Sequence, residues 1–454
     1  MGVPLAHLTP PTHPSPPTGN FTGKMSCAVS SLAGSGHAGF ENRRGTASQL
    51  NTPVSLTVTT FGDILIADWG NHCIRKITPF GDVVTFAGTG VTGHVDGPRA
   101  SAQFATPCGI AADSAGNVYV ADNHCIRHIS PDGEVRTIAG QSGTPGFADG
   151  QGTAAMFSDP KDLAIDGEGN LIVPDSGNHR IRRVTPQGDV VTIAGGPPGE
   201  LNAIGEAARF INPIAVAVSR SGDILVSESA QSYEPGKIRR IQPDRTVTTV
   251  ARMAEPRGLA FDGDDNLYVS CGFLVKKVSS TGDVTEFAGS NSGAGYSDGA
   301  PSQARFQNLT GIAIDAEGNI LVSGGDHRIR VIAAGVTPPP ILPLPQIPPS
   351  SRVAQMAALL SDPSRADVTF VVEGEKITAH TVLLAARSEY FERMLCGGFA
   401  EAGSSVAGSA AQIPIQNTTP AAFRALLRYL YTDELAFSED DVRACAHHGA
   451  QRWT

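Results

Sequence analysis

The sequence is poor in the features that mark membrane, disulfide-linked or strongly charged proteins. No run approaches the roughly 18 apolar residues of a membrane-spanning helix, and only 17% of the 454 residues are Asp, Glu, Lys or Arg. The seven cysteines form no CxxC pair, which favours neither a disulfide framework nor a zinc site. We therefore expect a cytoplasmic or nuclear protein with no membrane association.

Sequence patterns of common catalytic sites are missing as well. No GxSxG, no HExxH and no phosphate-binding glycine loop occurs. Residues 29–335 hold 24 Lys and Arg against 32 Asp and Glu, and such an acidic segment is a poor match for nucleic acid. We predict no catalytic residue, no cofactor and no metal ion.

A segment of about 53 residues is repeated six times. Its clearest landmark is a tight turn followed by an apolar strand, and successive turns begin 54, 53, 53, 43 and 53 residues apart. The turns are Gly62-Asp63, Gly116-Asn117, Gly169-Asn170, Gly222-Asp223, Asp265-Asn266 and Gly318-Asn319. This spacing is too long for ankyrin or tetratricopeptide repeats and fits a four-stranded propeller blade with a long loop.

Each unit contains four short apolar strands, except the last. After residues 329–332 the sixth unit runs into prolines and has no fourth strand, whereas residues 28–34 resemble the fourth strand at 83–88. We therefore predict a mainly β fold, a closed six-bladed β-propeller over 28–335, in which the N-terminal strand completes blade six.

Three polar positions recur in the units, and each has a functional and a structural interpretation. The histidines could form a metal ring, the acids could act in general acid–base catalysis, and the arginines of the third strands could form a basic rim for RNA. We interpret the histidines as structural, the acids as acceptors for backbone N–H groups, and the arginines as solvated pairs between blades. The histidines are His72, His124, His179 and His327. The acids are Asp68, Asp122, Asp175 and Glu228. The third-strand basic residues are Arg75, Arg127, Arg182, Arg239, Lys276 and Arg330.

The recurring motif resembles the NHL-repeat family. The matching residues are Asn71-His72-Cys73-Ile74-Arg75, Asn123-His124-Cys125-Ile126-Arg127 and Asn178-His179-Arg180-Ile181-Arg182. The resemblance implies a β-propeller whose loops bind a partner, which we expect to be a protein. Unit four replaces Asn-His with residues 229–236, and unit five lacks both the motif and the long preceding loop.

The remaining chain divides into three parts. Residues 1–27 form a proline-rich leader that we expect to be disordered, with Met25 as a second candidate start. Residues 336–352 contain seven prolines and predict an extended linker. Residues 353–454 predict a small α+β domain.

The C-terminal domain resembles the BTB/POZ family at 366–370, 379–391 and 423–432. The resemblance implies a homodimer, and many members of the family bridge a substrate to a cullin-3 ubiquitin ligase. It assigns Asp367 and His380 to the fold and the dimer pocket, and Phe399 and Glu401 to a cullin-binding step. The last helices of the family are missing after residue 446, so we expect a C-terminally incomplete domain.

Together these observations predict a non-enzymatic adaptor. Its propeller would bind a protein partner, and its BTB domain would dimerise and recruit cullin-3. The alternatives are a dimeric scaffold without a ubiquitin role, a propeller hydrolase or lyase with an axial metal, and an RNA-binding protein.

Overall fold

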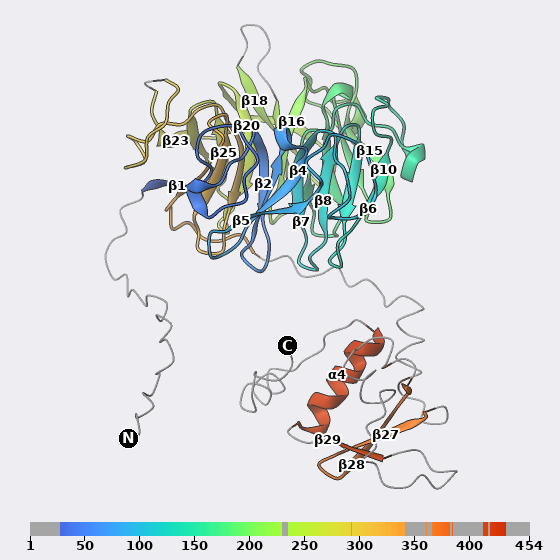
Figure 1. Cartoon of the computed structure of the whole chain (residues 1–454). Helices are drawn as coiled ribbons and strands as arrows, with labels where there is room; N and C mark the ends of the chain where they lie inside the picture. The colour runs from blue at the N-terminus through green and yellow to red at the C-terminus, as the bar shows by residue number, and fades with distance from the viewer. Residues whose placement is uncertain are drawn as a thin grey trace, which may run out of the picture. The chain divides into compact units, whose positions relative to one another are not determined.

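The structure is a computed structural model that describes residues 28–228, 235–291, 293–340, 360, 366–381, 384, 412–415 and 418–432. The chain divides into two compact units, Met1–Pro345 and Gln346–Thr454. The first unit is built of β-sheets, and the described part of the second includes a three-stranded sheet and a helix (Figure 1). Among the described residues, no helix is long and apolar enough to cross a membrane.

The described part of the first unit contains six antiparallel sheets, which we number in chain order. Sheet one contains β2 (Pro53–Val58), β3 (Ile64–Asp68), β4 (Cys73–Ile77) and β5 (Val83–Ala87). Sheet two contains β6 (Gly97–Pro98), β7 (Pro107–Ala112), β8 (Val118–Asp122), β9 (Cys125–Ile129) and β10 (Glu134–Gly140). Sheet three contains β11 (Gly150–Gln151), β12 (Ala164–Ile165), β13 (Leu171–Asp175), β14 (Arg180–Val184) and β15 (Asp189–Gly195).

Sheets four to six follow the same plan. Sheet four contains β16 (Pro213–Val218), β17 (Ile224–Glu228), β18 (Gly236–Ile241) and β19 (Val247–Met253). Sheet five contains β20 (Pro256–Phe261), β21 (Leu267–Cys271), β22 (Leu274–Val278) and β23 (Val284–Gly289). Sheet six contains β24 (Leu309–Ile314), β25 (Ile320–Gly324), β26 (Ile329–Ile332) and β1 (Val29–Ala33). Short 3-10 turns lie at Gly45–Ala47, Trp69–Asn71, Gly152–Ala154, Ser176–Asn178 and Gly205–Ala207.

The sheets pack face to face, and this explains why the second strand of each is apolar on both sides. Every residue of β3, β8, β13 and β21 is buried, as expected where a neighbouring sheet covers each face. The first strands lie next to one another in the order β2, β7, β12, β16, β20 and β24, and β24 also contacts β2. Strand β1 pairs antiparallel with β26, so the predicted N-terminal strand does join sheet six.

The second unit is small but has its own apolar core. Strand β27 (Val368–Val372) pairs antiparallel with β28 (Glu375–Ala379) and parallel with β29 (Gln412–Ile415). Helix α4 (Pro420–Thr432) begins with a proline, which suits the first helical position. Its Phe423 ring packs edge-on against Phe370 with centroids 5.1 Å apart, and Leu427 is buried beside them.

Candidate functional site

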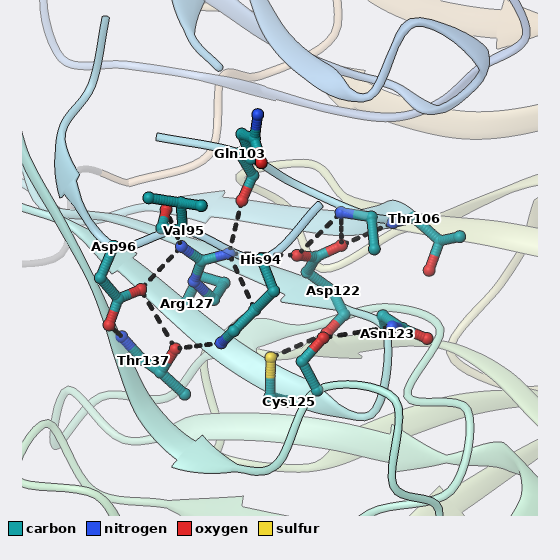
Figure 2. A network of polar contacts seen from close by, with 12 residues as sticks. His94, Val95, Asp96, Gln103, Thr106, Asp122, Asn123, Cys125, Arg127 and Thr137 are labelled. Carbon is teal, nitrogen blue, oxygen red and sulfur yellow. Dashed lines mark hydrogen bonds and ion pairs between the residues drawn. The ribbon is translucent and has the colours of Figure 1, made fainter. Parts of the chain in front are cut away.

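The most connected polar group in sheet two is the side chain of Arg127, which lies in β9 and is fully buried (Figure 2). Its Nη1 donates to Asp122 Oδ2 (3.2 Å) and to the carbonyl of Gln103 (3.0 Å). Its Nη2 donates to the carbonyl of Val95 (3.0 Å) and to Asp96 Oδ1 (2.7 Å). These four acceptors solvate a charge that would otherwise be very costly to bury.

The Arg127 network holds a connecting segment against the sheet. Val95, Asp96 and Gln103 all belong to residues 88–106, which link β5 to β7. Asp96 Oδ2 also accepts the backbone N–H of Thr137 in β10 (3.0 Å), and the guanidinium carbon of Arg127 lies 5.0 Å from the centre of the buried Phe104 ring. One arginine therefore fastens the middle of a long segment, at Val95 and Asp96, and its last part, at Gln103.

Asp122 is the acidic partner at the end of β8 and is also fully buried. Its Oδ1 accepts the backbone N–H groups of Thr106 (2.7 Å) and Ala105 (3.0 Å). Burial raises the pKa of Asp122, while the hydrogen bonds and the charge of Arg127 act in the opposite direction. The interpretation of the repeated acids as acceptors for backbone N–H groups is confirmed here.

The same network recurs in four other sheets. In sheets one, three and four the arginine pairs with the acid that ends the second strand, as Arg75–Asp68 (3.0 Å), Arg182–Asp175 (2.7 Å) and Arg239–Glu228 (3.2 Å). In sheet six Gly324 stands at that position, and Arg330 pairs with Asp298 of the preceding segment (2.5 Å). In each case the second guanidinium nitrogen donates to a carbonyl of the segment before the sheet, namely that of Glu41, Ala148, Leu201 or Ser297. The network is thus a property of the repeat and not of one sheet.

This burial corrects one prediction from the sequence. We expected solvated arginines that pair between blades, but the five arginine side chains are at most 1% exposed and bind their own sheet and the segment before it. The reason is that the preceding segment covers the arginine side chains and accepts their hydrogen bonds, whereas other third-strand side chains, such as Lys76, are partly exposed. The arginines therefore do not form a basic rim.

Sheet five lacks the network, and three features change together. Lys276 stands in place of the arginine, Cys271 in place of the acid, and only Ala254 and Glu255 separate β19 from β20. Cys271 Sγ instead lies 3.3 Å from Met253 Sδ in an apolar setting. Sheet six also lacks the acid, since Gly324 stands at its position, but keeps both the arginine and the long segment. The arginine is therefore the residue that holds the segment.

The four repeated histidines connect successive sheets. All have a left-handed backbone, with φ between 52° and 72°. The Nδ1 atoms of His124, His179 and His327 accept backbone N–H groups of Asp159 (2.9 Å), Asn212 (3.1 Å) and Thr52 (3.0 Å), each at the entry to the next first strand. His72 Nδ1 lies 2.6 Å from the carbonyl of Ala105. These contacts support the structural interpretation of the histidines.

One group of possible metal ligands escaped the sequence analysis. His94, Asp122 and Cys125 bring a nitrogen, an oxygen and a sulfur atom within 4.8 Å of one another, and zinc accepts such ligands. However, Arg127 Nη1 lies 3.3 Å from His94 Nδ1 and 3.2 Å from Asp122 Oδ2, so a cation already occupies the centre (Figure 2). Burial also raises the pKa of Cys125, which keeps the thiol protonated, whereas a metal needs the thiolate. The group is better explained as part of the Arg127 network.

The residues at the positions equivalent to His94 and Cys125 differ between the sheets, and the two residues of a pair change together. The pairs are Phe40 and Cys73, His94 and Cys125, Phe147 and Arg180, Glu200 and Lys237, and Tyr296 and Arg328. Arg180 and Arg328 stack on their aromatic partners, with the guanidinium carbon 3.9 and 3.7 Å from the ring centres. Glu200 and Lys237 form an ion pair of 2.7 Å. In each pair the first residue lies two positions before the Asp or Asn of the segment, and the second lies two positions before the arginine, so sequence spacing is the signal that links them.

The second unit contains two of the four predicted site residues within its described part. Asp367 Oδ1 accepts the N–H of Thr381 (2.7 Å), and its own N–H donates to the carbonyl of Ala379 (3.1 Å). The carbonyl of His380 accepts the N–H of Leu384 (3.1 Å). Both residues thus order the chain after β28. Phe399 and Glu401 lie outside the described residues, as does the predicted insertion at 229–234.

Comparisons with known proteins fit both units. A model of the BTB/POZ domain matches residues 356–452, and a model of the NHL repeat matches residues 50–77. "BTB/POZ domain-containing protein 9" of Rattus norvegicus is 44% identical over 85 residues, which are 19% of this chain and 13% of the rat protein. The chain therefore covers only a small part of this relative.

Two further similarities concern the β-sheets. "Protein SUPPRESSOR OF QUENCHING 1, chloroplastic" of Arabidopsis thaliana is 28% identical over 225 residues, 45% of this chain and 21% of that protein. A solved structure of a protein of unknown function from Bacteroides thetaiotaomicron superimposes with a TM-score of 0.52 at 18% identity, over 68% of this chain and 76% of that one. The latter similarity concerns the fold alone. The chain joins a β-propeller fold that carries an NHL repeat to a BTB/POZ domain.

Proposed function

We propose that the six sheets are the blades of a closed six-bladed propeller spanning residues 28–335. The place of the N-terminal strand in sheet six and two contacts between the last sheet and the start of the first support this. Strand β1 pairs with β26, His327 Nδ1 accepts the N–H of Thr52, and Thr310 Oγ1 donates to the carbonyl of Pro53 (3.2 Å). Ring closure of this kind removes the exposed face that a terminal blade would otherwise present to solvent.

We infer that the chain is a non-enzymatic adaptor whose propeller binds a protein partner. The observation that carries this inference is the use of the buried charges. In five sheets the arginine side chains donate to backbone carbonyls of the connecting segments. The repeated polar residues therefore hold long surface segments in fixed positions, and rigidly held loops are a common basis for protein recognition.

The BTB/POZ domain supplies the second half of the proposal. We propose that it forms a homodimer and docks cullin-3 through Phe399 and Glu401, both within the segment matched by the BTB/POZ model. The adaptor would then act by proximity, because it raises the effective concentration of its partner near the ligase. We place this activity in the cytoplasm or the nucleus.

Co-purification from cells tests the cullin half. The tagged full chain should retain cullin-3, and the double variant F399A/E401A should lose it while remaining dimeric in size-exclusion chromatography. E375Q is a matched control, because it removes a surface charge that pairs with Arg424 on the same domain. If the wild-type chain retains no cullin-3, a dimeric scaffold without a ubiquitin role replaces this part of the proposal.

A further inference from the structure

Five sheets of the propeller have their outer edge covered by the chain itself. In sheets two and three, β6 and β11 add a short antiparallel strand to β10 and β15. In the other three sheets a single antiparallel bridge does the same, and these bridges are Arg44–Asp82, Ile204–Thr246 and Gly299–Val29. Each covering residue comes from a connecting segment held by an arginine network.

The exposure of one residue near the start of each outer strand shows whether the edge of the sheet is covered. In the five covered sheets it is a valine that is 1–2% exposed, namely Val29, Val83, Val135, Val190 and Val247. Backbone bonds run outward from it to the segment, for example from the N–H of Val247 to the carbonyl of Ala203 (2.8 Å) and from that of Val29 to Gly299 (2.7 Å). Cover therefore buries the side chain and satisfies the outward backbone groups.

Sheet five has the same valine without the cover. Val284 is 37% exposed. Among the described residues no strand or bridge pairs with the outer side of β23, and only its last residue, Gly289, donates its N–H outward, to the carbonyl of Pro301 (2.8 Å). Val284 lies opposite Val278, as Val247 lies opposite Ile241 in sheet four, so its N–H and carbonyl also point outward. The short 254–255 connection cannot reach this edge, and a row of unpaired backbone groups is left at the surface.

We propose that the outer edge of β23 is a docking site for an extended basic segment of a partner protein, which adds an antiparallel fifth strand to sheet five. The chain's own segments show that this geometry is accessible, since β6 and β11 bind β10 and β15 in that orientation. Backbone hydrogen bonds give such strand addition its affinity, and alternate side chains give it specificity. The inference rests on the proposed adaptor function and names the site on the propeller that binds the partner.

The charge of the edge selects a basic occupant. In sheets two and three the strand residue opposite the buried arginine is a threonine that bonds an aspartate of the segment, as Thr137 and Thr192 do with Asp96 and Asp149. In sheet five the corresponding residue is Glu286, which lies opposite Lys276 and is exposed. Asp283 is exposed at the start of the same edge. Glu286 Oε1 accepts a hydrogen bond from Asn291 Nδ2 (2.7 Å), and its carboxylate keeps the negative charge. An acidic segment would be repelled here, whereas a lysine or arginine would pair with this charge.

The same charges argue against other occupants. A second copy paired through β23 would place Asp283 and Glu286 of both copies along one interface, which is unfavourable. Residues 1–27 contain six prolines and one lysine, and prolines cannot donate to a strand ladder. Residues 341–359 contain four prolines and one arginine. A partner protein is therefore the occupant that fits.

Binding of a defined peptide to the purified full chain tests the site. The probe is a fluorescent ten-residue peptide in which lysines alternate with valines and threonines, and its control is the same peptide with alternate backbone amides methylated. We expect polarisation to show binding of the first peptide and at least tenfold weaker binding of the second, because the methyl groups remove the ladder bonds. Hydrogen exchange should slow in the 282–289 segment when the first peptide binds.

Two chain variants and one matched control locate the site. V284P removes an outward N–H at an edge position that tolerates proline, and E286K reverses the selecting charge; each should weaken binding about tenfold or more. E134K makes the same charge change on the covered strand β10 and should leave binding within about twofold. Circular dichroism checks that every variant is folded.

Three results would overturn the inference. The first is that V284P and E286K bind the peptide as the wild type does. The second is that β23 is already protected from exchange in the free chain and loses protection when residues 1–27 are deleted. The third is protection that rises with chain concentration, which would identify a second copy. Partner capture by the propeller that survives both variants would leave the adaptor function intact and refute this site alone.

Discussion

Sheets two and five follow the same strand order but differ in how they use charge. Sheet two buries Arg127 and Asp122 completely and uses them to hold residues 88–106. Sheet five has Lys276 and Cys271 at these positions and no long segment before it. The apolar interior of the two sheets is nevertheless alike, since every residue of β8 and of β21 is buried. Formation of the blade therefore does not require the ion pair, whereas attachment of the segment does.

This difference also explains where the surface is open. Because the arginine network carries the residues that cover the outer strand, its loss in sheet five exposes Val284 and the edge of β23. The sheet that departs furthest from the repeat thus offers the outer edge that the described chain leaves free. The predictions below test whether the two sheets differ as the contacts imply.

The largest expected effect comes from truncating the buried arginine. R127A leaves Asp122 buried without its countercharge, so the free energy of unfolding should fall by about 3–5 kcal/mol. The matched change K276A in sheet five removes a half-buried lysine that forms no ion pair with a described residue, and it should cost less than about 1 kcal/mol. Urea unfolding followed by fluorescence measures both. Equal losses would mean that the network does not distinguish the sheets.

Removing both charges sharpens the same test. The double variant R127M/D122L replaces the pair with apolar side chains, and such replacements are often close to neutral. We expect it to be more stable than R127A while residues 88–106 become faster in hydrogen exchange. Slow exchange in that segment would show that something other than Arg127 holds it.

The valine at the start of the outer strand should show the next largest contrast. V190A removes two methyl groups from a site that is 1% exposed and should cost roughly 2 kcal/mol through lost burial and the remaining cavity. V284A makes the same change at a site that is 37% exposed and should cost no more than about 0.5 kcal/mol. Thermal unfolding of the two variants side by side measures the difference. A large loss for V284A would mean that β23 is covered in solution.

Much of the sheet structure could be predicted from the sequence, because glycine turns and apolar strands recur at fixed spacing. The position of β1 in sheet six followed from the missing fourth strand after residue 332. The burial of the arginines did not follow, since an arginine beside an isoleucine on a strand usually marks an exposed face. Strand β14 is regular at Ile181 and Arg182, so their side chains point to opposite faces of the sheet, and both are buried because both faces are covered.

The candidate site was predicted less well, and the reason is physical. His94 and Asp96 lie in a connecting segment whose contacts are with residues about 30 to 40 positions away, such as Arg127 and Thr137. No local periodicity reports such contacts. Asp367 and His380 came only from family resemblance, and their proposed role in a dimer pocket stays a prediction, as does the role of Phe399 and Glu401.

Sheet three differs from sheet five at its inner strand, and this difference predicts that the free energy of unfolding depends on pH. Pro174 of β13 lacks an N–H, β12 is only two residues long, and Asp162 instead accepts the N–H of Val216 in sheet four (3.2 Å). The corresponding residue in sheet five is Gly258. Burial raises the pKa of Asp162 to about 7, against the hydrogen bonds that Asp162 accepts.

The direction in which stability changes with pH follows from proton linkage. The folded state binds the proton of Asp162 more tightly than the unfolded state, so stability should fall as pH rises from about 4 to about 7. We expect a loss on the order of 1.5 kcal/mol, because partial exposure of Asp162 reduces the effect of the shift. D162N keeps an acceptor for Val216 without the charge, so its unfolding free energy should not show this fall. A G258A variant, which leaves Asp162 in place, should retain the fall seen in the wild type.

The smallest contrast concerns the links between sheets. His124 joins sheet two to sheet three by accepting the N–H of Asp159 with its side chain, whereas sheet five joins sheet six through the backbone carbonyl of Gly272, which accepts the N–H of Leu309 (2.8 Å). H124A should therefore lose about 1 kcal/mol, the usual value of one hydrogen bond. F273A, at the histidine position of sheet five, keeps its link and should lose less, since Phe273 is 37% exposed. Hydrogen exchange at the backbone amides of Asp159 and Leu309 separates the two cases. Exchange at Asp159 should become faster in H124A, and exchange at Leu309 should stay unchanged in F273A. The reverse pattern would show that the histidines do not join the sheets.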